Sequence, residues 1–187
     1  MRIILMGPPG AGKGTQAKSL STQLRVPHVS TGDLFRREIA ADTALGAEAA
    51  RYINSGNYVP DDLTNRMVDR RLQESDCVDG FLLDGYPRTL EQIEALDVIL
   101  EKHGHVLDLV IDITADYEAI VQRLFKRAQE EGREDDSETV IRHRLEVYAE
   151  RTEPLVAVYR DRGILVSVDG LGSVADVSAR INSAIPH

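Results

Sequence analysis

The sequence has a single cysteine, Cys77, among 187 residues. One cysteine cannot form an internal disulfide, and it excludes a zinc site built from cysteines. No run of 18 apolar residues occurs, so the sequence predicts no membrane-spanning helix. The apolar run at residues 3–6 is too short for the central region of a signal peptide and leads directly into a glycine-rich segment. We therefore expect a cytoplasmic protein without a membrane partner.

Positive charge is also scarce. The formal net charge is −9, from 31 acidic and 22 basic residues, which argues against a broad attraction to nucleic acid or anionic lipid. Only 4 of the basic residues are lysine and 18 are arginine, whose planar guanidinium suits bidentate binding of phosphate. The number alone fits a compositional bias toward arginine equally well, so the positions of the arginines must decide.

The remaining composition is that of a globular protein, with 42% hydrophobic and 28% charged residues. A chain of this length is long for one domain and short for two. It contains no nucleophile elbow, no paired carboxylates suited to acid–base catalysis and no metal-binding pair of histidines on a helix. These absences leave few classes of enzyme open.

The most informative segment is residues 7–15, GPPGAGKGT. It follows an apolar run and precedes a helix-compatible segment, which is the context of a phosphate-binding loop. In such a loop, backbone N–H groups and the helix N-terminus hold phosphate oxygens, and a lysine, here Lys13, reaches the outer phosphates. The alternative is a glycine-rich turn without a ligand, but the strand, spacing, lysine and helix all disfavour it. Gly14 stands where the general pattern has Ser or Thr, and Thr15 follows, so direct binding of magnesium by the loop hydroxyl is in doubt.

Short apolar runs alternate with segments of helical periodicity. The runs are aliphatic or β-branched and mostly lack polar alternation, as strands buried on both faces do. We predict strands at 3–6, 26–29, 81–83, 109–113 and 164–168, and helices at 16–24, 64–73, 89–103, 117–129 and 174–185. This order predicts an α/β fold with a five-stranded parallel sheet, helices on both faces and a ligand site beyond the carboxyl ends of the strands.

Two segments do not fit this alternation. Residues 31–60 have helical pieces but no central strand, and residues 130–136 are a polar run before a long helical stretch at 137–160. We expect Asp136 to be the N-cap of that stretch and Pro154 to bend or break it. Both segments follow strand ends, where a substrate pocket and its cover would lie.

Charged side chains follow two of the predicted strands. Asp84 ends the run FLLD. In a phosphate-loop protein an acid at this position helps to hold Mg²⁺, and we expect Asp84 to do so through water. The alternative is that Asp84 only forms a turn, as an Asp at the end of a strand often does. Gly85 and Pro87 force a sharp exit from this strand, which brings Arg88 to the carboxyl edge of the sheet. Arg36 holds a similar position after the second strand. The alternative interpretation of Arg36 is a helix residue whose side chain is exposed to solvent.

Four further arginines surround the second unusual segment. Arg123 and Arg127 are four residues apart and share one helix face, while Arg133 and Arg144 flank the polar run and the next helix. Taken singly, each is more simply a surface arginine. Taken as a set, they could close on a negatively charged ligand.

Together these segments resemble the adenylate kinase family of phosphate-loop nucleoside monophosphate kinases. The resemblance rests on GPPGAGKGTQ at 7–16, STGDLFR at 30–36, DGYPRT at 84–89 with Gln92, GREDD at 132–136 with Arg144, and TEPL at 152–155. It extends from Met1 to about Gly172, with the motifs in order. It implies the fold of phosphate-loop nucleoside triphosphate hydrolases, with an AMP-binding segment and a lid inserted.

The resemblance also implies roles for individual residues. The implied catalytic set is Lys13, Arg88, Arg123, Arg127, Arg133 and Arg144. The implied ATP-binding residues are Gly10, Ala11, Gly12, Lys13, Gly14, Thr15, Arg123, Arg127 and Gly172. The implied AMP-binding residues are Thr31, Arg36, Asn57, Tyr58, Val59, Gly85, Tyr86, Pro87, Arg88, Gln92, Arg133 and Arg144. Among these, Thr31 and Gln92 would face adenine, and Arg36 and Arg88 would bind the phosphate of AMP.

As a whole, the resemblance implies one domain, 1–187, with an AMP-binding segment at 31–59 and a lid at 127–137. Only residues 128–132 separate Arg127 from Arg133, so the lid is of the short type and zinc is not expected. Mg²⁺ is expected with ATP, with Asp84 as its contact through water. We expect a monomer whose partners are ATP, AMP and ADP, without nucleic acid.

The implied reaction is reversible transfer of the terminal phosphoryl group of ATP to AMP, which gives two ADP. The nearest alternative is a UMP/CMP kinase, which would differ in the pocket for the acceptor base. A nucleotide-dependent switch without turnover is a third hypothesis. The arginines in the two insertions argue against it, because a switch needs no second phosphate site.

Overall fold

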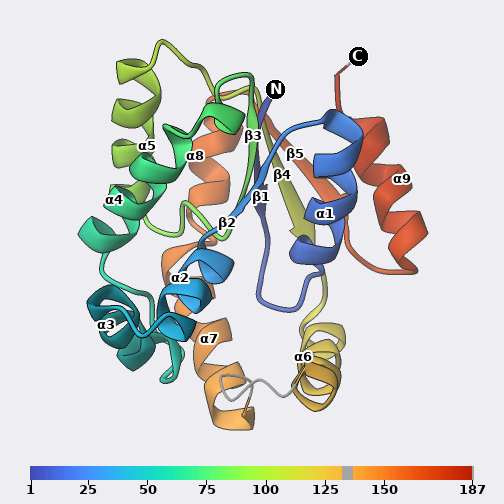
Figure 1. Ribbon diagram of the computed structural model, residues 1–187. Helices are drawn as coiled ribbons and strands as arrows, with labels where there is room; N and C mark the ends of the chain where they lie inside the picture. The colour runs from blue at the N-terminus through green and yellow to red at the C-terminus, as the bar shows by residue number, and fades with distance from the viewer. Residues whose placement is uncertain (132–136, 187) are drawn as a thin grey trace.

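The computed structural model describes the backbone of residues 1–131 and 137–186, and the side chains of residues 1–126 and 137–186. In this part of the chain, five parallel strands form one sheet in the order β2-β3-β1-β4-β5. The strands are β1 Arg2–Met6, β2 His28–Ser30, β3 Phe81–Asp84, β4 Leu109–Thr114 and β5 Leu165–Asp169. The predicted parallel sheet is confirmed (Figure 1).

Side chains alternate between two hydrophobic clusters, one on each face of the sheet. In β1, Ile4 and Met6 join one cluster, while Ile3 and Leu5 join the other. This arrangement explains the continuous apolar runs in the sequence, because nearly all positions of the central strands are buried. The register pairs Leu5 with Asp84 of β3, so Asp84 lies beside the end of the central strand.

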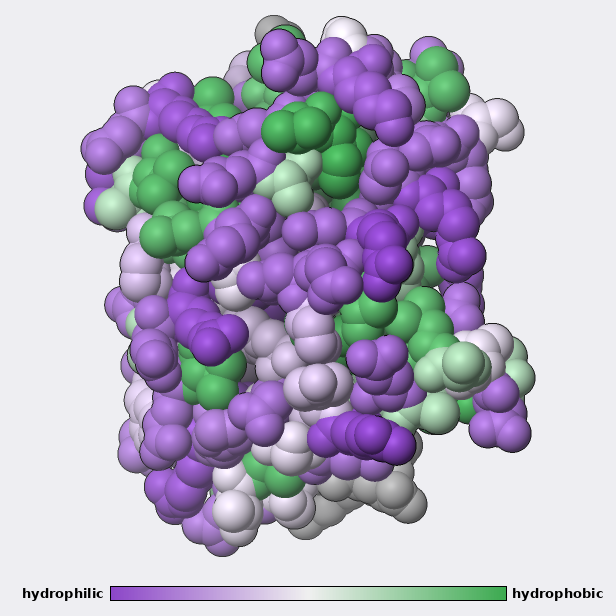
Figure 2. Space-filling model, turned by 90° about the vertical axis from the view of Figure 1, so that its left-hand side faces the viewer, coloured by the Kyte–Doolittle hydropathy of each residue, from purple (hydrophilic) through white to green (hydrophobic). Residues whose placement is uncertain are grey.

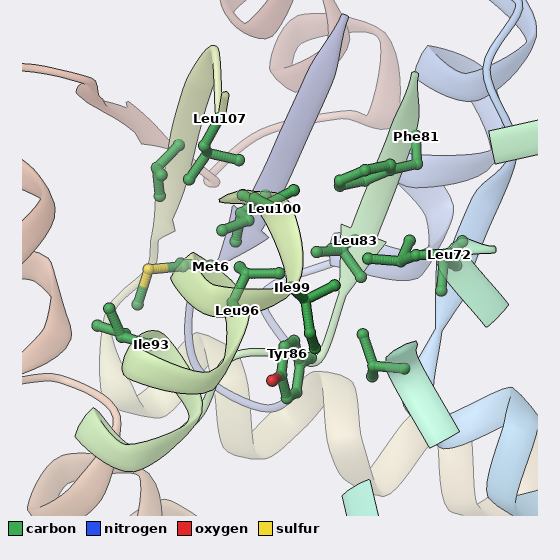
Figure 3. Close-up of a cluster of buried hydrophobic side chains, with 14 of the residues drawn as sticks. Met6, Leu72, Phe81, Leu83, Tyr86, Ile93, Leu96, Ile99, Leu100 and Leu107 are labelled. Atoms are coloured by element: carbon green, nitrogen blue, oxygen red, sulfur yellow. The ribbon is translucent and has the colours of Figure 1, made fainter. Parts of the chain in front are cut away.

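Helices cover both faces (Figure 1). On one face lie α1 Lys13–Leu24 and α9 Val174–Ala184, and on the other lie α4 Asp61–Leu72, α5 Leu90–Lys102 and α8 Leu155–Asp161. Figure 3 shows the cluster that contains Met6, in which Ile93, Leu96 and Leu100 of α5 lie over the strands that carry Met6 and Leu83. A short 3₁₀ helix, Ser75–Cys77, precedes β3 and was not expected.

Helices lie beyond the carboxyl edge of the sheet, at the bottom of Figure 1, within the unusual segment after β2 and on either side of the polar run after β4. After β2 come α2 Thr31–Ala40 and α3 Ala44–Ile53, which pack around Phe35 and Ala49. After β4 come α6 Tyr117–Glu131 and α7 Glu138–Arg151, which pack around Leu124 and Ile141. Each helix pair therefore has a small core of its own, and the predicted position of residues 31–60 directly after a strand end is confirmed.

The structure corrects several boundaries. The N-cap of α7 is Ser137, in extended conformation, so the prediction of Asp136 as N-cap is wrong by one residue; serine serves this position as well as aspartate does. Pro154 breaks the predicted long helix, because α7 ends at Arg151 and α8 begins at Leu155. Strand β2 begins at His28 instead of Val26, because Pro27 has no N–H group to donate to a neighbouring strand.

The surface of the protein is more polar than its core. Figure 2 shows the face over α3, α4 and α5 as mostly hydrophilic, with separate hydrophobic areas. In the described ranges, every helix is too short or too polar to span a bilayer.

Candidate functional site

Two adjoining hollows open at the carboxyl edge of the sheet. The larger has a volume of about 640 Å³ and is bordered by the segment between β1 and α1, the end of β3 and the inserted helices. The smaller, of about 80 Å³, lies between α2, α4 and α5. Both are lined by Arg36, Tyr58, Gly85, Arg88 and Arg144. Two ligands bound in these hollows would therefore meet at a group of arginines.

The glycine-rich segment has the backbone of an anion-binding loop. Gly7 and Gly12 have φ of 134° and 93°, a region that other residues rarely adopt. A Cβ on Gly7 would also collide with the carbonyl oxygen of Ile113 in β4. The loop ends at α1, whose first residues, 13–15, line the larger hollow, so the positive end of the helix dipole lies at the cleft. The first turn has no acidic residue to neutralise it. The predicted ATP-binding residues of the loop line the larger hollow: Gly10, Ala11, Gly12, Lys13, Gly14 and Thr15.

Lys13 extends back over the loop that precedes it. Its Nζ donates to the carbonyl oxygens of Gly7 at 2.7 Å and Pro8 at 2.9 Å. These contacts hold the ammonium group at the wall of the larger hollow, between the loop and the strand ends. A phosphate bound to the loop N–H groups would lie within reach of this charge.

Asp84 is a buried carboxylate at the end of β3, and its Oδ2 accepts a hydrogen bond from His28 Nε2 at 3.2 Å. Burial by itself would raise the pKa of Asp84, but the hydrogen bond from His28 and the charges of Lys13 and Arg88 outweigh it and hold the pKa below its usual value. Asp84 is therefore ionised at neutral pH. The role of His28 was not predicted, because nothing in its local sequence distinguishes it.

A magnesium ion held mainly by nucleotide phosphates fits this arrangement. Within the described side chains, no group of three or more His, Cys, Asp or Glu residues could hold a metal ion alone. Mg²⁺ usually keeps several waters and needs only one or two protein carboxylates beside substrate phosphates. An ionised Asp84 that lines the larger hollow provides one such carboxylate.

Arg88 is held by contacts from three parts of the chain. Its Nε donates to the carbonyl oxygen of Gly85 at 2.7 Å, and its guanidinium lies 5.0 Å from the centre of the Tyr58 ring. Thr152, between α7 and α8, donates its hydroxyl to the carbonyl oxygen of Arg88 at 2.9 Å. That hydroxyl has one proton, so Tyr58 must be the donor in the 2.7 Å contact between its hydroxyl and Thr152 Oγ1. Thr152 was not predicted as a site residue.

Thr31 and Gln92 line the smaller hollow and are both buried. Thr31 donates its hydroxyl to the carbonyl oxygen of Gly85 at 2.8 Å. The side-chain oxygen of Gln92 accepts from the backbone N–H of Arg88 at 2.7 Å, and its nitrogen donates to Asp61. The structure thus brings together the two residues predicted to face adenine.

The other predicted arginines are distributed around both hollows. Arg36 donates to Asp33 at 2.6 Å, and Arg123 donates to the carbonyl oxygen of Gly170 at 2.9 Å. Burial raises the pKa of Asp33, but its hydrogen bond to Arg36 and the charge of Arg36 outweigh this and hold the pKa below the usual value. Arg144 lines both hollows. The side chain of Arg127 and the whole of Arg133 lie outside the described residues, as do residues 132–136 of the predicted lid.

The remaining predicted residues also lie at the cleft. Asn57, Tyr58 and Val59 line the smaller hollow, and Gly172 lines the larger. Asn57 Oδ1 lies 2.8 Å from His143 Nε2, which joins the segment after α3 to α7. Gly85, Tyr86 and Pro87 border the larger hollow, but the Tyr86 ring lies in the core and its hydroxyl donates to Asn65 Oδ1 at 2.7 Å (Figure 3). Any ligand contact of Tyr86 must therefore involve its backbone.

The chain is similar to known proteins of one family. A family model described as adenylate kinase matches residues 5–164. The adenylate kinase of Kocuria rhizophila is 58% identical over 184 residues, which are 98% of each chain. Those of Nocardioides sp. and Clavibacter michiganensis are each 54% identical, covering 99% and 98% of this chain and 97% and 92% of their own. These names do not favour the UMP/CMP kinase alternative. The chain therefore belongs to the adenylate kinase family.

Proposed function

We propose that this protein catalyses the reversible transfer of the terminal phosphoryl group of ATP to AMP, which gives two ADP. Membership of the family supports this reaction. The observation that carries the proposal in this chain is the pair of hollows that share Arg36, Arg88 and Arg144. A phosphoryl transfer between two nucleotides needs two phosphate sites that meet, whereas hydrolysis or switching needs one.

ATP would occupy the larger hollow. The loop N–H groups from Gly10 to Thr15 would hold its phosphates, and Lys13 would neutralise charge on the outer ones. Arg123 and Gly172 line the same hollow and would border the rest of the nucleotide, together with Arg127. Mg²⁺ carried with ATP neutralises phosphate charge, and Asp84 would hold it through water. His28 would keep the Asp84 carboxylate in place.

AMP would occupy the smaller hollow. Its adenine would lie against Thr31 and Gln92, with the segment 57–59 as the wall. Arg36 and Arg88 line both hollows and would bind its phosphate at the point where they meet. The backbone of residues 85–87 would lie alongside AMP. This orientation directs an oxygen of the AMP phosphate toward the terminal phosphorus of ATP.

The protein's part in the transfer is alignment and charge neutralisation. Phosphoryl transfer needs little covalent assistance, because charge spreads over the oxygens of the transferred group. Lys13, Arg88, Arg123 and Arg144 surround the larger hollow, and we propose that Arg127 and Arg133 join them. Each aimed donor of this kind contributes on the order of 10² to 10³ in rate.

We further propose that residues 1–187 act as one domain whose segments 31–59 and 127–137 close over the nucleotides. Closure would exclude water, so that the phosphoryl group passes to AMP instead of being hydrolysed. The short lid requires no zinc. In the cell we expect a cytoplasmic monomer that acts on ATP, AMP and ADP, without a nucleic-acid or membrane partner.

A turnover assay with ATP and one acceptor at a time tests the proposal. AMP should be strongly preferred over UMP, CMP and GMP, and two ADP should appear for each ATP consumed. Activity should require Mg²⁺, and metal analysis should find no stoichiometric zinc. Equal kcat/KM for UMP and AMP would reject the proposed acceptor, and consumption of ATP without any acceptor would indicate a hydrolase or a switch.

A further inference from the structure

Asp61 has no role in the proposed reaction, yet it contacts the residue that would read the acceptor base. It is the first residue of α4 and is partly buried. Its Oδ1 accepts from Gln92 Nε2 at 2.5 Å, and its Oδ2 accepts from Thr89 Oγ1 at 3.0 Å. Gln92 itself is only 2% exposed, so its side chain has little freedom to exchange these partners with water.

The two partners of the Gln92 amide fix which end is oxygen and which is nitrogen. Both oxygens of Asp61 act as acceptors, so the amide nitrogen faces Asp61. The backbone N–H of Arg88 can only donate, so the oxygen must face Arg88. Among the described residues, one N–H and one oxygen lone pair of this amide remain without a partner, and Gln92 lines the smaller hollow.

A fixed amide can distinguish two kinds of purine. The pairing edge of adenine offers a donor, the 6-amino group, beside an acceptor, N1. A 6-oxo purine such as hypoxanthine or guanine offers an acceptor beside a donor in the same places. An amide presents one acceptor and one donor, so reversing it would change which of the two purines it matches in a given pose.

We propose that Asp61 is a positioning residue that holds the Gln92 amide in the orientation that matches a 6-amino purine and rejects a 6-oxo purine. The proposal rests on the proposed function, in which Gln92 faces the base of AMP. A site that pairs with one base leaves its buried polar groups unpaired with the other, and this is the source of the discrimination.

The test compares kcat/KM for AMP with that for inosine monophosphate, which has a 6-oxo group and no 2-amino group. In Asp61→Ala the amide keeps only its contact with the Arg88 N–H, so the reversed orientation becomes easier to reach and the ratio of the two values should fall about tenfold, the scale of one lost hydrogen bond. Asp61→Asn should lower the ratio less, because asparagine can present either an acceptor or a donor to Gln92. The control is Asp62→Ala, which removes a carboxylate from the same first turn; Asp62 is 72% exposed, pairs with Arg66, and should leave the ratio unchanged.

A second comparison asks whether Asp61 acts through Gln92. In a Gln92→Ala background, Asp61→Ala should produce no further change in the ratio, because there is no amide left to orient. An equal further loss would show that the effect of Asp61 is structural and would overturn the proposal. An unchanged ratio in Asp61→Ala, or in Asp61→Asn if the alanine variant does not fold, would also overturn it.

These outcomes separate the inference from the proposed function. If the parent protein does not use AMP as an acceptor, the proposed function is wrong. If the parent strongly prefers AMP to inosine monophosphate and both Asp61 variants keep that preference, only the role of Asp61 is wrong.

Discussion

Lys13 is the side chain on which the proposed ATP site should depend most. Its ammonium group donates to the carbonyl oxygens of Gly7 and Pro8 in its own loop, at the wall of the cleft. Lys13→Ala should therefore lower kcat by roughly 10²-fold or more while the melting temperature changes little. Lys102→Ala, on a surface lysine with 61% of its side chain exposed, is the matched control and should keep full activity. Near-normal turnover of Lys13→Ala would refute the loop assignment.

The charge of Asp84 makes the stability of the fold depend on pH. Its pKa in the folded protein lies below the usual 3.8, so its interactions stabilise the fold above about pH 4, and this contribution is lost as the pH falls through the lower, folded-state pKa. Asp84→Asn lacks this contribution. The stability of the parent should thus fall more steeply on acidification than that of the variant, measured by urea unfolding at about pH 7 and about pH 3. Parallel pH profiles would contradict the assigned charge state.

The residues missed by sequence reasoning share a physical cause. His28 meets Asp84 because β2 and β3 are adjacent and parallel, and Asp61 meets Gln92 because α4 and α5 pack side by side. Such partners are far apart in the chain and belong to no local motif. The positions of Lys13 and Arg88 at the cleft were predictable, because the turns that place them are encoded by neighbouring residues.

At the scale of elements, the central strands were the most predictable part. They are buried on both faces, so nearly every residue is apolar and the signal is strong. Helix starts were less predictable, because α1 begins at Lys13, within a glycine-rich loop that does not look helical. The helices of the two insertions gave only a weak pattern, since each buries its apolar side chains against a small separate core.

The junction between α7 and α8 connects three elements through Thr152. Its hydroxyl donates to Arg88 and accepts from Tyr58, so it joins the segment after α3 to the turn after β3. Thr152→Val keeps the shape but removes both hydrogen bonds, and should raise KM for AMP about fivefold to tenfold, the scale of one or two lost hydrogen bonds. Thr152→Ser should restore KM for AMP, and KM for ATP should change little in both variants. An equal rise in both KM values would indicate a general loss of structure.

At the scale of the whole molecule, both hollows open at the carboxyl edge of a sheet that has a hydrophobic cluster on each face. Leu96 of α5 is completely buried in one cluster (Figure 3). Leu96→Ala should lower the free energy of unfolding by about 2–5 kcal/mol, through lost burial and the cavity it leaves. Val98→Ala, at a residue 63% exposed on the same helix, should cost much less. Chemical denaturation of both variants gives the comparison, and an equal loss would place Leu96 outside the core.

The central claim is that two nucleotide sites meet at Arg88, with AMP on the side of Gln92 and ATP on the side of the loop. The most direct measurement is a separate titration of the parent and of Arg88→Ala with each nucleotide, alongside a thermal melt. Arg88→Ala should bind AMP at least about tenfold more weakly, as expected when a charged hydrogen bond is lost, with nearly unchanged affinity for ATP and a nearly unchanged melting temperature. Loss of ATP affinity with AMP affinity intact would contradict the claim.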